Sequence, residues 1–269
     1  MNKGELLEKR DAIKSYISGL GRVLVAFSGG VDSTVVAALA YEALGEDAVA
    51  IIIDSPLLPR RELEEALMIT DEIGIQCKVI QFNELAIENL AGNPKDRCYT
   101  CKKARYTTLK EYAIEQGFDA LLEGTNASDL SEYRPGLKAS DELDVKKPLL
   151  LFGLSKQDTR EMAKLLGLSN ALKPSNSCLA ARVPYGEKLT QERLQRIDQC
   201  KEIIREVTGV SVIRARDHGD LLRIEVGLDE RENVCGIQVM DKLYDRIHGL
   251  GFRFVVLDLK GYRFGSYDT

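Results

Sequence analysis

The chain has 269 residues, of which 44% are hydrophobic and 29% charged, and its formal net charge at pH 7 is −5. A chain of this length buries roughly three-quarters of its unfolded surface, so it needs no disulfide scaffold, and six cysteines are too few to form one. The N-terminal segment is charged throughout, and the longest apolar runs are too short to span a bilayer. We therefore expect a cytoplasmic protein with reduced thiols and no membrane partner.

The first part of the chain alternates between strand patterns and helical patterns. Unbroken apolar runs, of the kind found in parallel strands buried on both faces, occur twice near the N-terminus, and two further strands follow. The predicted strands are 22–27, 48–53, 76–82 and 118–124, and the predicted helices are 2–20, 34–44, 60–73 and 102–116. Alternation of this kind indicates an α/β fold with a parallel sheet.

The pattern changes after about residue 180. A helix is predicted first, then two strands separated by a turn, then a second helix and a last strand. In chain order these elements are 190–207, 211–216, 221–226, 237–248 and 252–259. The chain is therefore predicted to contain an α/β domain over residues 1–180 and a smaller α+β domain, with the order αββαβ, over residues 181–269.

The segment SGGVDS, residues 28–33, joins the first predicted strand to the helix after it. Its glycines let the backbone approach an anion closely, and the helix N-terminus offers free N–H groups and a positive dipole end. Ser28 and Ser33 add hydroxyl donors, and Asp32 supplies a hard oxygen ligand for Mg²⁺. A simple turn with Ser33 as helix N-cap is the alternative. The position at the carboxyl end of a strand, where open α/β sheets bind ligands, favours a phosphate site.

This hexapeptide resembles the pyrophosphate loop, SGGxDS, of the N-type ATP pyrophosphatases, or PP-loop enzymes, whose fold is that of the adenine nucleotide α-hydrolases. The resemblance implies an enzyme that binds ATP and Mg²⁺, adenylates a substrate oxygen, releases pyrophosphate and lets a nitrogen or sulfur nucleophile displace AMP. GTNASD, residues 124–129, also resembles a GTNxxD segment of that superfamily. The residues thereby implied to bind the nucleotide are Ser28, Gly29, Gly30, Asp32, Ser33, Asp54, Ser55 and Gly124, with Asp32 as the Mg²⁺ ligand.

Cys98 and Cys101 form a CxxC pair in a charged, exposed segment. Alone the pair is compatible with half a zinc site, a redox pair or two ligands of an iron–sulfur cluster. Zinc is disfavoured because His218 and His248 both lie in the second predicted domain and no second CxxC occurs. A redox pair is disfavoured because it would be expected in a thioredoxin-like setting, which this segment is not. Cys178 lies in a polar, proline-bounded stretch of the kind that often carries active-site residues, although a buried thiol is the alternative.

Three cysteines can hold a 4Fe–4S cluster by three of its irons and leave the fourth open, whereas the usual complement is four cysteines. An open iron can carry a hydrosulfide and deliver it to an activated carbonyl. Cys98, Cys101 and Cys178 are therefore predicted to be the cluster ligands and, with Asp32, the catalytic residues. The other cysteines are expected to act as small hydrophobes in the core, and these are Cys77, Cys200 and Cys235.

Several stretches together resemble the LarE family, the pyridinium-3,5-biscarboxylic acid mononucleotide sulfurtransferases. Besides SGGVDS, they are EYRPGLKA at 132–139, SCLAARVPYG at 177–186 and LDLKGYRFG at 257–265. The resemblance covers nearly the whole chain. It implies conversion of both substrate carboxylates to thiocarboxylates for the nickel-pincer nucleotide of lactate racemase. One branch of the family sacrifices the cysteine matching Cys178 and lacks the CxxC, so this chain resembles the branch that binds a 4Fe–4S cluster.

The resemblance also implies that Arg134, Arg182 and Arg214 bind the substrate phosphate or carboxylates, with surface solvation as the alternative, and that the protein forms a homohexamer. The rival functions are a self-sacrificing enzyme that uses the sulfur of Cys178 and a PP-loop tRNA thiolase. The charge of −5 and the lack of a basic tail argue against a nucleic-acid partner. We therefore expect a small nucleotide substrate and sulfide or another sulfur donor as partners.

Overall fold

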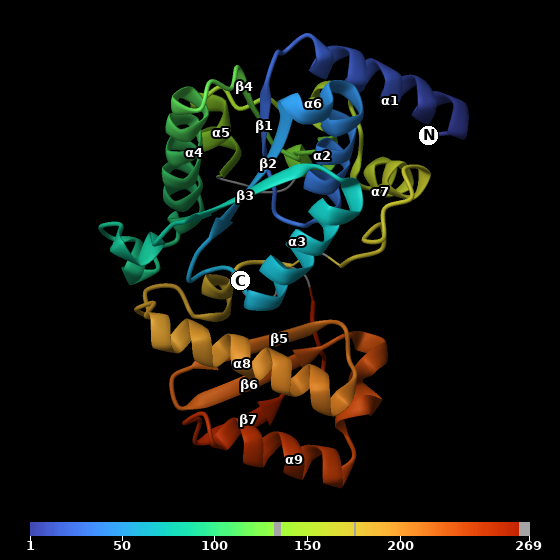
Figure 1. The fold of residues 1–269 in the computed structure, drawn as a ribbon. Coiled ribbons are helices and arrows are strands. Elements are labelled where there is room, and N and C mark those ends of the chain that lie inside the picture. The colour runs from blue at the N-terminus through green and yellow to red at the C-terminus, as the bar shows by residue number, and fades with distance from the viewer. Residues whose placement is uncertain (132–135, 175, 264–269) are drawn as a thin grey trace. The chain divides into compact units, whose positions relative to one another are not determined.

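The computed structural model describes residues 1–131, 136–174 and 176–263 (Figure 1). The chain forms two compact units. The first unit comprises Met1–Asn83 and Asp96–Asn176, and the second comprises Glu84–Lys95 and Ser177–Thr269. Along the chain the last change of unit falls between Asn176 and Ser177, and the bounds 1–180 and 181–269 stay a prediction. No helix in the described parts of the chain is long and apolar enough to cross a membrane.

The first unit contains the predicted parallel sheet, which has four strands in the order β3-β2-β1-β4. The strands are β1 (Val23–Ala26), β2 (Ala48–Asp54), β3 (Gln76–Gln81) and β4 (Ala120–Leu122). Since β2 lies on one side of β1 and β4 on the other, the direction of strand addition reverses between β1 and β4. Open α/β sheets bind ligands at the carboxyl ends of the strands that flank such a reversal.

Helices cover both faces of this sheet (Figure 1). Successive residues of β1 alternate between the two hydrophobic cores, because side chains of a strand point to opposite faces in turn: Val23 and Val25 enter one core and Leu24 enters the other. The helices of this unit are α1 (Lys3–Ser18), α2 (Val31–Leu44), α3 (Arg60–Ile73), α4 (Arg97–Glu115), α5 (Gly136–Glu142), α6 (Pro148–Leu151) and α7 (Lys156–Leu165). Helix α4 supplies the core on the Leu24 face, and the opposite core includes residues of α1, α2, α3 and α7.

Helix α4 begins earlier than the sequence suggested, at Arg97 instead of near residue 102. The charged residues around the CxxC pointed to an exposed segment before the helix. Arg97, Lys102 and Lys103 are instead good helix formers inside the helix, and the carbonyl oxygen of Asp96 accepts the first backbone hydrogen bonds, from Tyr99 and Thr100. The CxxC pair therefore lies in the first two turns of α4.

The second unit has the predicted αββαβ order. Its elements are α8 (Gln191–Thr208), β5 (Ile213–His218), β6 (Leu221–Val226), α9 (Ile237–His248) and β7 (Phe254–Leu257). Strands β5 and β6 pair antiparallel, β6 and β7 pair parallel, and the sheet order is β5-β6-β7. The fold class predicted from sequence, an α/β unit followed by a smaller α+β unit, is thus confirmed.

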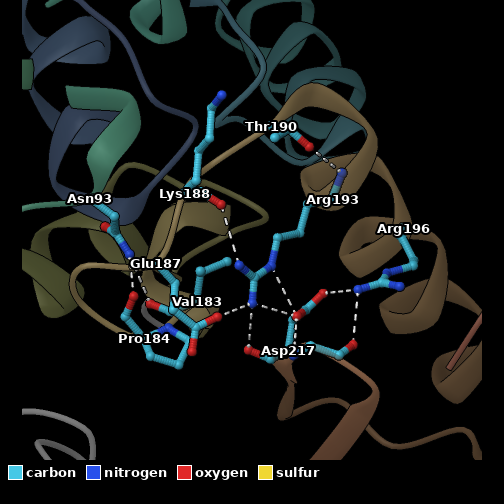
Figure 2. A network of polar contacts seen from close by, with 10 residues as sticks. Asn93, Val183, Pro184, Glu187, Lys188, Thr190, Arg193, Arg196 and Asp217 are labelled. Atoms are coloured by element: carbon cyan, nitrogen blue, oxygen red, sulfur yellow. Dashed lines mark hydrogen bonds and ion pairs between the residues drawn. The ribbon is translucent and has the colours of Figure 1, made fainter. Parts of the chain in front are cut away.

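Figure 2 shows the polar network that ties this unit together. The fully buried Asp217 at the end of β5 accepts hydrogen bonds from Arg193 Nε at 2.9 Å and Arg196 Nη2 at 2.6 Å, both from α8. The buried Asn93 comes from the early segment of this unit and donates to the carbonyl oxygens of residues 183–184 at 3.1 and 2.7 Å. These bonds explain why a segment distant in sequence belongs to the second unit.

All six cysteines lie in described parts of the chain, and none forms a disulfide. Cys200 is fully buried, as predicted, and burial raises its pKa to about 12. Cys77 is half-buried, and burial likewise raises its pKa. The prediction for Cys235 is wrong, because this residue is exposed at the end of a 3₁₀ turn, with its Sγ 3.1 Å from the carbonyl oxygen of Arg231.

Candidate active site

The predicted phosphate loop connects β1 to α2 in the first unit. Gly29 has φ +68°, a left-handed conformation that favours glycine, and a Cβ added there would lie 2.8 Å from the Ala66 Cβ of α3. Gly30 occupies the N-cap position of α2, and no described side chain caps it. The N–H groups at this helix N-terminus therefore remain available to an anion, and the helix dipole adds positive potential.

The side chains of the loop form a compact cluster. Ser28 Oγ and Ser33 Oγ lie 3.0 Å apart, and Ser33 Oγ donates to the Gly30 carbonyl oxygen at 3.1 Å. Asn126 Nδ2 donates to Asp32 Oδ1 at 3.2 Å, which fixes the direction of that carboxylate. The structure thus brings the predicted loop residues together, with an acidic ligand suitable for Mg²⁺ beside hydroxyl donors.

Gly124, at the carboxyl end of β4, packs its backbone directly against the start of α2. A Cβ added to Gly124 would lie 2.6 Å from Ser33 N and 2.7 Å from the Asp32 carbonyl carbon. These are backbone atoms that cannot swing aside, so only glycine fits. The backbone N–H of the nearby Asn126 donates to Asp129 Oδ2 at 3.0 Å, which holds the turn after Gly124 in place.

A pocket of about 290 Å³ opens at this end of the sheet. Its lining comes from the loop, from the apolar end of β2 at 51–53, from Leu58, from α3, from α4 and from the residues that follow β4. The polar lining residues are Ser28, Asp32, Ser33, Glu62, Lys102, Arg105, Tyr106, Glu123, Thr125 and Asp129. A pocket lined by both apolar residues and a phosphate loop suits a nucleotide, whose base is flat and apolar and whose phosphates are anionic.

The charges inside the pocket are closely paired. Lys102 Nζ lies 2.9 Å from Glu123 Oε2, and the Tyr106 hydroxyl donates to the same carboxylate. Burial alone would raise the pKa of Glu123, but the Lys102 charge and the hydrogen bonds from Tyr106, Lys102 and Ser140 outweigh it and lower the pKa. Burial and the neighbouring carboxylate raise the pKa of Tyr106 well above its usual value.

Asp54 is the last residue of β2 and Ser55 follows it, but neither is among the described residues that line the pocket. Asp54 pairs with Arg60 at 2.6 Å and accepts from Gln81 Nε2 at 2.8 Å. Ser55 is buried, and its Oγ accepts from Arg105 Nη2 at 2.9 Å. Ser55 is therefore connected to the pocket wall through Arg105, whereas Arg60 and Gln81, which contact Asp54, are not among the lining residues.

The CxxC pair lies on the helix that forms this wall. Cys98, Cys101 and Arg105 are spaced three and four residues apart on α4, so they share one helical face. Cys98 is exposed and Cys101 partly exposed. Lys102 and Arg105 line the pocket but were missed from the sequence. The helical period counted from Cys98 would have found them had the start of α4 been placed correctly.

Cys178 belongs to the second unit, at the N-cap of the 3₁₀ turn Leu179–Arg182. It is partly exposed, and its carbonyl oxygen accepts a hydrogen bond from Ala181 N at 3.1 Å. The described residues contain no group of three or more His, Cys, Asp or Glu side chains arranged to hold a metal ion. The three predicted cluster ligands are divided between the units, and the predicted cluster remains a prediction.

Arginines gather around this turn of the second unit. Arg182, Arg214 and Arg216 are each at least 94% buried, having exposures of 4%, 6% and 4%. Burial and the charges of Arg214 and Arg216 lower the pKa of Arg182 to about 9. Glu225 accepts from Arg216 Nη2 and from Arg223 Nη2, each at 3.0 Å. The cluster therefore has an excess of positive charge that an anion would relieve.

The same arginines hold the segment that carries Cys178. Arg182 Nη1 donates to Ser177 Oγ at 2.9 Å, and Arg216 Nη1 donates to the Ala181 carbonyl oxygen at 2.8 Å. Arg214 stacks over Tyr262, its guanidinium carbon 4.3 Å from the ring centre. Arg134 lies outside the described residues, so its predicted role in substrate binding stays a prediction.

A pyrophosphate-type loop beside a nucleotide-sized pocket, in a 3-2-1-4 parallel sheet, defines an ATP-using enzyme of the PP-loop class. Residues 6–173 match the NAD synthase family. The chain is 34% identical to pyridinium-3,5-bisthiocarboxylic acid mononucleotide synthase of Lactiplantibacillus plantarum, over 98% of this chain and 95% of that protein. It therefore belongs to the LarE family of PP-loop enzymes and is an ATP-using sulfurtransferase.

The chain is also similar in sequence to other proteins. An uncharacterised protein of Synechocystis sp. is 38% identical over 98% of each chain. One of the subunits of the glutamine-hydrolysing GMP synthase of Methanococcus vannielii is 29% identical over 76% of this chain and 69% of that protein. This similarity to a GMP synthase covers a smaller share of the chain than the similarity to the Lactiplantibacillus plantarum protein does.

Proposed function

We propose that this protein uses ATP to activate the carboxylates of pyridinium-3,5-biscarboxylic acid mononucleotide and converts them to thiocarboxylates, for the nickel-pincer nucleotide of a lactate racemase. One observation carries the proposal: helix α4 bears Cys98 and Cys101 in its first turns and lines the nucleotide pocket with its next ones. The sulfur-handling residues thus adjoin the pocket in which a carboxylate would be adenylated. The name of the Lactiplantibacillus plantarum relative supports the choice of substrate.

In the first step a substrate carboxylate oxygen attacks the α-phosphorus of ATP, and the bond to the β-phosphate oxygen breaks to release pyrophosphate. Ser28, Ser33 and the N–H groups at the start of α2 hold the departing pyrophosphate. Asp32, oriented by Asn126, would hold a Mg²⁺ ion, which would neutralise part of the charge of the pyrophosphate. The apolar end of β2 accepts the adenine base. A sulfide nucleophile then adds to the acyl carbon and AMP leaves.

We propose Cys98, Cys101 and Cys178 as ligands of a 4Fe–4S cluster. The donor set fits, because all three are thiols outside disulfides and each is at least partly exposed. When bound, the cluster would supply an open iron site that carries the sulfur to be transferred. That sulfur would come from free sulfide or from another sulfur donor. The protein itself holds Cys98 and Cys101 on one face of α4. It holds the turn after Cys178 through Arg216.

We propose that Arg182 and Arg214, with Arg134, bind the phosphate or carboxylates of the substrate. The charge excess around Arg182 supports an anionic ligand. We also propose a cytoplasmic homohexamer, on the family resemblance, and domains at 1–180 and 181–269. A small nucleotide is favoured over tRNA because the chain is acidic overall.

The cluster is tested by anaerobic reconstitution of the parent and a Cys98→Ala, Cys101→Ala double variant. The parent should hold about four irons and four sulfides per chain and thiolate the substrate over many turnovers. The double variant should lose both properties, whereas Cys235→Ala, at an exposed cysteine of the second unit, should match the parent. Thiolation at the parent rate by the double variant would refute the cluster.

Intact-protein mass spectrometry after one turnover separates this function from the self-sacrificing alternative. Sacrifice of the Cys178 sulfur would lower the chain mass by about 34 Da, the mass of hydrogen sulfide. Delivery through the cluster leaves the mass unchanged. Thiolation of tRNA instead of the mononucleotide, measured in the same reaction, would contradict the proposed substrate.

A further inference from the structure

The segment that follows α7 packs against the phosphate loop within the first unit. Asn170 is 7% exposed, and its Nδ2 donates to the Gly29 carbonyl oxygen at 3.2 Å and to Thr34 Oγ1 at 2.9 Å. Lys173 Nζ lies 3.4 Å from the same Gly29 carbonyl oxygen. Neither residue lies in a recognisable sequence motif. Both contacts converge on one peptide group of the loop.

Anchoring that carbonyl fixes the orientation of the whole peptide unit. A trans peptide is planar, so the Gly30 N–H points away from the side on which the Gly29 carbonyl is held. On that opposite side the Gly30 N–H donates a hydrogen bond to Ser28 Oγ, with an N–O distance of 3.4 Å, and Ser28 lines the pocket. Thr34 Oγ1 in turn donates to the Gly30 carbonyl oxygen at 2.8 Å, so both glycine carbonyls are tied on the side of Asn170.

The segment that carries Asn170 is itself held firmly. Arg160 of α7 donates to the carbonyl oxygens of Ala171 and Lys173, each at 2.9 Å. Lys173 Nζ pairs with Glu62 at 2.8 Å and Glu65 at 2.9 Å, both on α3. Burial would lower the pKa of Lys173, but these carboxylates outweigh it and raise the pKa, so Lys173 remains a cation. Asn170 is therefore presented to the loop from a rigid support.

We propose that Asn170 is a positioning residue for pyrophosphate: by holding the Gly29 carbonyl and the Thr34 hydroxyl, it keeps the N–H groups of the loop directed at the anion before ATP arrives. The amide is suited to this role because both of its contacts need a donor on Nδ2. A loop already in its binding conformation loses less entropy when the anion binds. The inference rests on the proposed pyrophosphate-binding role of residues 28–33.

The test compares Asn170→Ala and Asn170→Asp with the parent. The matched control is Ser169→Ala, which removes a contact of the neighbouring residue to Glu72, away from the loop. Binding of inorganic pyrophosphate with Mg²⁺ is measured by calorimetry at a temperature where melting curves show every variant folded. We expect affinity to fall about tenfold in Asn170→Ala, the loss of one or two hydrogen bonds. Asn170→Asp should lose more, since a carboxylate repels the Gly29 carbonyl.

Steady-state kinetics provide a second measurement. The KM for ATP should rise in both Asn170 variants while Ser169→Ala matches the parent. A lower melting temperature with unchanged pyrophosphate affinity would mean a purely structural role and would overturn the inference, with the loop function intact. If the parent itself binds no magnesium pyrophosphate and releases none from ATP, the proposed loop function fails, and the role of Asn170 fails with it.

Discussion

The proposed anion sites of the two units are built in different ways. In the first unit the phosphate loop relies on backbone N–H groups and a helix N-terminus, and nearby side-chain charges are paired, as Lys102 is with Glu123. In the second unit the buried guanidinium groups of Arg182, Arg214 and Arg216 crowd together. The first arrangement costs little in the absence of ligand, whereas the second stores repulsion that an anion would relieve.

This difference has a consequence for stability. A site made of peptide groups is stabilised by the hydrogen bonds and packing that any loop requires, so its disruption acts mainly on binding. A cluster of buried cations depends on its counter-charge, so its disruption acts on the fold. Substitutions at the centre of each region should therefore separate loss of activity from loss of stability.

The largest effect is expected from Glu225→Gln in the second unit. Glu225 is 1% exposed and accepts from the buried Arg216 and from the partly exposed Arg223, so its neutralisation removes the carboxylate charge beside a buried cation. Removal of one partner of a buried pair costs about 3–5 kcal/mol of unfolding free energy. Chemical denaturation measures this cost. The control is Glu206→Gln, whose partner Arg246 is exposed, and which should change stability by less than about 1 kcal/mol.

The same denaturation experiment can be repeated with added inorganic phosphate. If the excess charge around Arg182 suits an anion, phosphate should stabilise the parent, and Arg182→Gln should reduce that stabilisation. Equal stability of Glu225→Gln and the parent would mean that the arginine cluster needs no counter-charge, and the contrast with the first unit would fail.

The next effect is on activity alone. Asp32→Ala removes the proposed Mg²⁺ ligand and should lower the rate of pyrophosphate release at least about a hundredfold, which corresponds to about 2.7 kcal/mol. Because Asp32 is only partly buried, the melting temperature should stay close to that of the parent. Asp47→Ala, an exposed acidic position of the same unit, is the control and should keep the parent rate. Parent-like release by Asp32→Ala would exclude the assigned role.

A third substitution tests whether the first unit depends on backbone contact. Gly124→Ala introduces a methyl group where Ser33 N and the Asp32 carbonyl carbon leave no space. Overpacking of this kind costs about 1–3 kcal/mol, and the displaced loop should also bind pyrophosphate more weakly. Gly92→Ala, where a Cβ meets no atom within 4 Å, serves as the control. Equal melting temperatures for Gly124→Ala and Gly92→Ala would show that the close approach is not required.

The contrast between the units also explains what could be predicted from the sequence. The loop at 28–33 was found because a backbone site demands glycines at fixed spacing after a buried strand. Parallel strands buried on both faces likewise leave unbroken apolar runs, so the sheet was predicted in nearly the right places. The early start of α4 was missed because its charged first turns resemble a loop.

Side-chain sites leave weaker signals. Arg182 and Arg216 come from different elements, and only the fold brings them around the segment of Cys178. Asn170 contacts the loop across more than a hundred residues, a pairing that no local pattern encodes. Cys235 was expected in the core from its apolar neighbours, but a turn places it at the surface. Positions whose role depends on long-range contacts therefore had to be read from the structure.

The smallest effect concerns pH and the pairing of charges in the pocket. The pKa of Glu123 is lowered in the folded protein, since Lys102 and the hydrogen bonds to the carboxylate outweigh burial. Its ionised form therefore adds stability that is fully present above about pH 4.5, its usual pKa, and is lost as the pH falls through the lower folded value. The advantage of the parent over Glu123→Gln should shrink on acidification, as measured by denaturation from about pH 7 to pH 3. Glu115→Gln, at an exposed position of α4, corrects for the loss of one charge. A stability difference that stays constant or grows towards acid pH would mean that the pocket carboxylate is not stabilised by its partners, and the charge balance assigned to the first unit would be wrong.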